Sequence, residues 1–122
     1  MDFATLALVQ AAIWVVVGAA FPAIPRQWVA PFGTRMDTEA AFFGRLLGAS
    51  FLSFGLLCWF GRDAGAVPAQ QAIAYANLTV NGFGAVLHAS AALRGQIVNT
   101  RAWGLVVLNG LLAVAWIVVA RG

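Results

Sequence analysis

The chain has 122 residues, of which 62% are hydrophobic and 9% are charged, and its formal net charge is +3. With a mean hydropathy of +0.88, this composition excludes an ordinary soluble domain and predicts an all-α integral membrane protein. All seven basic residues are arginines that stand singly between apolar runs, so no basic patch for nucleic acid forms. Four spans of about 20 residues would use nearly the whole chain, which predicts one transmembrane domain over residues 1–122.

The first apolar run predicts a membrane-spanning helix over residues 3–21, with Gln10 in its middle. We expect Pro22 and Pro25 to end this helix, because proline removes a backbone donor and restricts the residue before it. The chain begins with Asp2 in place of the positive charges of a secretory signal. We therefore expect the first helix to escape cleavage.

The second predicted span covers residues 40–60 and follows a long polar connection. Arg45 lies about one turn inside its first end. Gly44 and Gly48 lie four residues apart, which is the spacing that lets membrane helices approach closely. The turn-rich segment 61–68 then separates this span from the next one.

The third predicted span, residues 73–93, contains two asparagines, Asn77 and Asn81, and the single histidine of the chain, His88. At 100° per residue, these three side chains and Gly84 fall within about 60° of arc. A polar stripe is therefore expected along one face of this helix.

The fourth predicted span, residues 103–120, contains Asn109. Counted from the ends of their helices, Asn109 and His88 both lie about 9 Å inside the same surface of the membrane. Arg45 enters from that surface as well. These three side chains are thus candidates to converge and to bind a ligand.

A second polar layer, nearer the middle of the membrane, is expected to contain Gln10, Ser53 and Asn81. A polar side chain that faces lipid costs free energy, so these residues should point into the bundle. They either form hydrogen bonds between helices or line a ligand- or water-filled cavity, and the sequence leaves both interpretations open.

His88 itself has three interpretations. A neutral imidazole could form structural hydrogen bonds, for example with Asn109. A proton relay would need ionisable neighbours, and no Asp or Glu lies in any predicted span. The third interpretation is an axial ligand to the metal of a haem or (bacterio)chlorophyll. Here the small residue Gly84, one turn earlier, resembles the arrangement in bacterial light-harvesting helices, which implies room for a flat pigment.

The stretch Phe43-Gly44-Arg45-Leu46-Leu47-Gly48, with Gly55 further on and the proline-interrupted first loop, resembles small bacterial four-transmembrane-helix proteins of uncharacterised function, including DoxX-like ones. This resemblance implies an antiparallel four-helix transmembrane bundle and no particular activity. The chain departs from that pattern because the first, third and fourth predicted spans contain no charged residue.

The arginines predict the orientation of the chain, because positive residues accumulate on the cytoplasmic side. Five arginines lie in or near the first and third loops and two on the opposite side: Arg26, Arg35, Arg45, Arg94 and Arg101 against Arg62 and Arg121. We therefore expect the first and third loops in the cytoplasm and both termini in the periplasm of a bacterial inner membrane. The five tryptophans are expected to supply several anchors at the membrane surfaces; they are Trp14, Trp28, Trp59, Trp103 and Trp116.

The function expected from these patterns is non-catalytic. The spans contain no carboxylate pair, and Cys58, the single cysteine, excludes an internal disulfide and a cysteine metal cluster. We expect an accessory or structural subunit of a larger membrane complex, which packs through Gly- and Ala-rich helix faces against other subunits or itself and binds lipid. The alternative is a small homo-oligomeric transporter or channel that uses the face of Asn77, Asn81 and His88.

Overall fold

The computed structural model describes residues 1–32, 34–96 and 100–122, and this part of the chain contains helices and no strand. The elements are α1 (Phe3–Ala23), α2 (Pro25–Val29), the 3-10 turn η1 (Ala30–Phe32), α3 (Thr38–Gly61), α4 (Val67–Leu93) and α5 (Arg101–Arg121). The predicted all-helical class is confirmed for the described residues.

Three helical segments are long and apolar enough to cross a membrane: Phe3–Ala23, Thr38–Gly61 and Trp103–Arg121. They correspond to the first, second and fourth predicted spans and support a helical membrane protein. The 27-residue α4 matches the third predicted span in position, but its polar side chains keep its hydropathy below that of the other three. A bundle with four membrane spans therefore stays a prediction.

The prolines set the helix ends differently from the prediction. α1 continues through Pro22 and ends after Ala23, where Ile24 leaves the helical conformation with φ −139° and ψ 55°. Pro22 is tolerated because it lies in the last turn and interrupts little of the hydrogen-bond ladder. Pro25 then begins α2, a position where its missing donor costs nothing.

Aspartates begin two of the long helices. The carboxylate of Asp2 accepts a hydrogen bond from the backbone N–H of Thr5 at 2.8 Å, and Asp37 accepts one from Ala40 at 2.7 Å. Each carboxylate satisfies a backbone donor of the first turn that has no partner within the helix. The bond from Thr5 also holds the pKa of Asp2 below its ordinary value.

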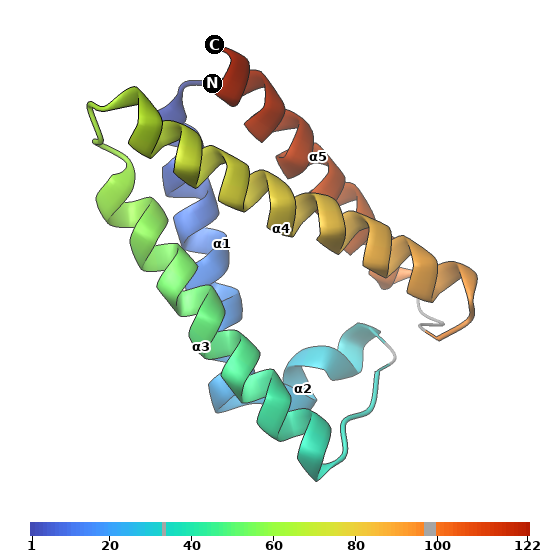
Figure 1. Ribbon diagram of the computed structural model, residues 1–122. Helices are drawn as coiled ribbons and strands as arrows, with labels where there is room; N and C mark the ends of the chain where they lie inside the picture. Colours follow the sequence, from blue (N-terminus) through green and yellow to red (C-terminus); the bar gives the residue numbers. More distant parts are fainter. Residues whose placement is uncertain (33, 97–99) are drawn as a thin grey trace.

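The long helices pack mainly as two pairs, α1 with α3 and α4 with α5 (Figure 1). Glycines permit the close approach of α1 and α3. A Cβ at Gly48 would lie 2.4 Å from Cδ of Pro22, and one at Gly18 would lie 2.6 Å from the backbone nitrogen of Leu52. The predicted close helix contact at Gly48 is thus confirmed, and its partner is α1 of the same chain.

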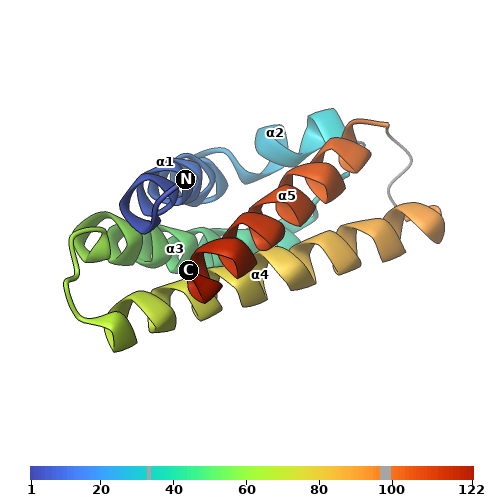
Figure 2. The ribbon, with the colours of Figure 1, turned by 90° about the horizontal axis from the view of Figure 1, so that it is seen from above.

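The two pairs are closest at the end of the molecule that holds both termini, and they diverge towards the other end (Figures 1 and 2). Near the closed end, side chains from all four long helices form one apolar core: Leu6, Ala7, Ala11, Trp14, Cys58, Ile73, Ala74, Leu112 and Trp116. At the open end, η1 contacts α5. The core near the termini is therefore the main joint between the two pairs.

Candidate functional site

The polar stripe predicted on α4 is divided between two environments. Asn77 and Asn81 lie inside the joint between the helix pairs, where they are 0% and 1% exposed. His88, near the end of the same helix, is partly buried. The two amides and the histidine therefore belong to different sites.

Asn81 joins three helices through the side chain of Gln10, which is also fully buried. Asn81 Nδ2 donates to Gln10 Oε1 of α1 at 3.0 Å, and Trp116 Nε1 of α5 donates to the same oxygen at 3.0 Å. The second hydrogen on Asn81 Nδ2 goes to the carbonyl of Asn77 at 2.7 Å. Hydrogen bonds of this kind fix the relative rotation of helices that apolar contacts alone would leave free to adjust.

Asn77 makes the corresponding connection to α1 and α3. Its Oδ1 accepts from Trp14 Nε1 of α1 at 2.9 Å, and its Nδ2 donates to Cys58 Sγ of α3 at 3.2 Å and to the carbonyl of Ile73 at 2.9 Å. We call the six side chains that make these two sets of bonds the polar cluster: Gln10, Trp14, Cys58, Asn77, Asn81 and Trp116. Every long helix contributes to it.

The predicted middle layer is confirmed in part. Gln10 and Asn81 meet, as their equal depth indicates. The placement of Ser53 in this layer is wrong, since its side chain is exposed and its hydroxyl donates to the carbonyl of Ala49 in the same helix at 3.2 Å. A serine can satisfy its hydroxyl within its own helix, so it need not point into a bundle.

Trp14 and Trp116 are residues whose role the sequence did not reveal. They are 6% and 0% exposed, so they lie in the core between the helices. The available signal was the indole N–H itself, because such a donor in an apolar segment needs an acceptor. The acceptors lie on other helices, Asn77 for Trp14 and Gln10 for Trp116.

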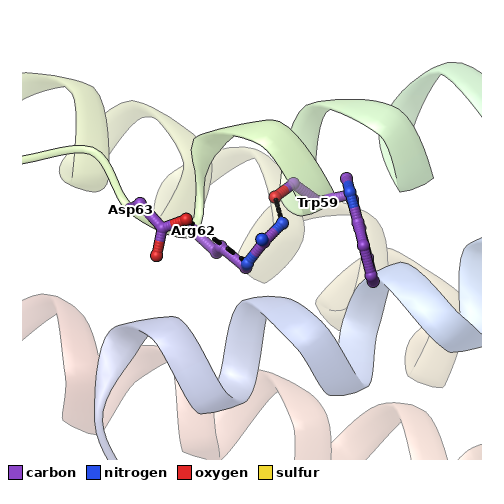
Figure 3. A network of polar contacts seen from close by, with 3 residues as sticks. All are labelled: Trp59, Arg62 and Asp63. Carbon is purple, nitrogen blue, oxygen red and sulfur yellow. Dashed lines mark hydrogen bonds and ion pairs between the residues drawn. The ribbon is translucent and has the colours of Figure 1, made fainter.

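Trp59 fits the expectation of a surface anchor better, because it is 49% exposed and lies at the end of α3. The guanidinium of Arg62 lies 4.5 Å from the centre of its ring and donates to its backbone carbonyl (Figure 3). Arg62 also forms an ion pair with Asp63 at 3.4 Å. This group closes the last turn of α3 next to the loop that leads to α4.

The histidine and Asn109 do not bond to each other, although Asn109 lies against Gly84, one turn before His88 on α4. His88 Nδ1 lies 2.6 Å from the carbonyl of Gly84, so Nδ1 carries a hydrogen and donates it to this carbonyl. Asn109 Nδ2 donates to the carbonyl of Leu105 at 2.8 Å. The predicted bond between His88 and Asn109 is absent within the described residues, because each side chain bonds to its own helix.

The surroundings of His88 do not fit a flat pigment of the light-harvesting kind. A Cβ at Gly84 would lie 2.7 Å from Asn109 Oδ1. The small residue one turn before the histidine thus makes room for an amide of α5 and not for a macrocycle. As a separate matter, the described residues include no group of three or more His, Cys, Asp or Glu side chains that could hold a metal ion.

Arg45 lies away from these groups. Its Nε donates to the carbonyl of Pro22 at 3.3 Å, and its side chain is otherwise exposed. This bond satisfies one of the carbonyls that the end of α1 leaves without a helical partner. The structure brings Asn109 close to the turn that carries His88, but it does not bring Arg45 there.

Two hollows lie outside the polar cluster. One, of about 220 Å³, has a largely polar lining that includes Gln70, Gln71 and Arg121, with Ala74 of α4 also in its wall. The other, of about 360 Å³, is an apolar groove between α1 and α3. The groove is lined by apolar side chains of both helices, among them Val15 and Leu56.

Comparison with known proteins found no matching family model, no matching curated protein and no matching solved structure.

Proposed function

We propose that this chain is a non-catalytic membrane subunit that completes its packing against another membrane protein. The buried amides support a structural role, because nearly all their hydrogen bonds are made within the chain. Asn77 and Asn81 are enclosed, which favours bonds between helices over the lining of an open water-filled path. The inner-membrane location, the predicted orientation and the resemblance to DoxX-like proteins form part of this proposal.

The observation that carries the proposal is the position of three helical glycines. Among the described residues, a Cβ at Gly82, Gly104 or Gly110 would meet no atom of another part of the chain within 4 Å. Glycine inside a helix costs about 0.5–1 kcal/mol relative to alanine, and no contact that the structure describes compensates for that cost. These glycines would let a neighbouring helix approach α4 and α5 closely.

The glycines of α3 do not serve this purpose. Gly48 and Gly55 face α1, where Pro22 and Val15 fill the space next to them. The partner surface is therefore assigned to α4 and α5 instead of the Gly44/Gly48 face. The apolar side chains around it on α5 are strongly exposed, with Val107 at 60% and Leu111 at 65%.

A test uses Gly104→Leu, with Gly65→Leu as the matched control in the loop before α4, where a Cβ also has no neighbour. The wild-type chain, extracted in mild detergent from its native membrane, should run in a complex larger than itself on a native gel. Gly104→Leu should release the chain, whereas Gly65→Leu should not. A wild-type chain that runs alone would overturn the proposal.

The alternative proposal, a small transporter or channel, is supported by the polar hollow beside Ala74, which lies one turn from Asn77 on α4. If the polar stripe conducts a solute, Asn81→Leu should abolish flux into liposomes that contain the purified chain. Unchanged flux in that variant would count against this alternative.

A further inference from the structure

Gln10 and Asn81 each keep one polar atom without a partner, although both side chains are enclosed. They are 0% and 1% exposed. Gln10 Nε2 and Asn81 Oδ1 form no hydrogen bond with any of the described residues. Buried polar atoms are almost always bonded, to protein or to ordered water, so this pair calls for an explanation.

The neighbouring bonds fix which amide atom is which. An indole N–H can only donate, so the atom of Gln10 that faces Trp116 Nε1 at 3.0 Å must be the oxygen. The atom of Asn81 that faces this oxygen and the carbonyl of Asn77 must then be the nitrogen. Exchanging oxygen and nitrogen in either amide would set donor against donor or acceptor against acceptor. The two unbonded atoms are therefore a donor and an acceptor on adjacent amides.

A molecule that accepts one hydrogen bond and donates another complements this pair. Water is the smallest molecule that does so, and internal waters typically bridge buried polar groups of this kind. Larger ligands are excluded because protein atoms enclose both amides. A source of water lies nearby, since the wall of the polar hollow includes Ala74, two helical turns or about 10 Å from Asn81 along α4.

We propose that Gln10 Nε2 and Asn81 Oδ1 bind one internal water molecule in the joint of α1, α4 and α5. The water accepts from Gln10 Nε2 and donates to Asn81 Oδ1. It completes the hydrogen bonding of the polar cluster. This site does not depend on the proposed function as a subunit, because it lies inside the chain.

Water-edited solid-state NMR of the full chain in lipid bilayers, with nitrogen-15 in the side-chain amides, tests this site. Magnetisation should pass from water to Gln10 Nε2. Asn77 Nδ2 is the matched control, because both its hydrogens are bonded within the protein, to Cys58 and Ile73. Its signal should receive no transfer. The exposed Gln71, which lines the polar hollow, should show strong transfer.

Each other outcome would overturn the water site. Absence of transfer to Gln10, with a direct bond from its Nε2 to Asn81 Oδ1, would show that the two amides satisfy each other. Equal transfer to Gln10 and Asn77 would show a cluster open to bulk water instead of one enclosed site.

Discussion

Trp14 and Trp116 of the polar cluster both donate an indole hydrogen bond, but their acceptors differ in how many other bonds they receive. Among the described residues, Asn77 Oδ1 accepts from Trp14 alone, whereas Gln10 Oε1 accepts from both Trp116 and Asn81. A buried acceptor that loses its single donor costs about 1–3 kcal/mol, while loss of one bond among several costs about 0.5–1.5 kcal/mol. Loss of the Trp14 indole N–H should therefore cost more stability than loss of the Trp116 indole N–H.

We predict that Trp14→Phe lowers the free energy of unfolding more than Trp116→Phe does. Both variants remove an indole N–H and a similar volume from the core, so each serves as the control for the other. Reversible unfolding in mild detergent or bilayers, followed by fluorescence, measures the difference. Equal losses, or a larger loss for Trp116→Phe, would show that the unpaired oxygen of Asn77 is not the dominant cost.

At the scale of the helix, glycines with the same propensity occupy opposite environments. Gly48 of α3 is pressed against Phe21 and Pro22, and a Cβ there would lie 2.4 Å from the proline ring. A Cβ at Gly82 of α4 would meet no neighbour within 4 Å among the described residues. Helix propensity favours alanine at both sites. Packing should therefore decide whether a Gly→Ala substitution raises or lowers the free energy of unfolding.

We predict that Gly48→Ala destabilises the isolated chain by about 1–3 kcal/mol, because α1 and α3 must move apart to admit the methyl group. Gly82→Ala should stabilise it by about 0.5–1 kcal/mol. The same unfolding measurement applies to both variants. A neutral Gly48→Ala would contradict the close contact of these two helices.

Sequence patterns identified the helices well but not their rotations. Apolar runs located all four long helices, and equal depth correctly paired Gln10 with Asn81. Depth does not reveal which way a side chain points, so Ser53 was assigned to the core and the burial of Trp116 was not predicted. Arg45 was misplaced for another reason, since a long side chain on a helix end can reach several acceptors.

At the scale of the whole molecule, two helix pairs are joined near the termini and diverge beyond this joint (Figures 1 and 2). In a membrane, lipid chains are as apolar as the core, so packing and hydrogen bonds hold helices together instead of hydrophobic burial. The polar cluster is therefore expected to determine the orientation of one helix pair relative to the other. The contact between Gln10 and Asn81 is the most direct link of this kind.

A double-mutant cycle on this contact tests the account most directly. The free energy of unfolding in a bilayer would be measured for the wild type, Gln10→Leu, Asn81→Leu and the double variant. Bonds between membrane helices average about 0.6 kcal/mol and reach about 1.7 kcal/mol, so we predict a favourable coupling energy in this range. A coupling energy of zero would contradict the claim that the polar cluster joins the two helix pairs.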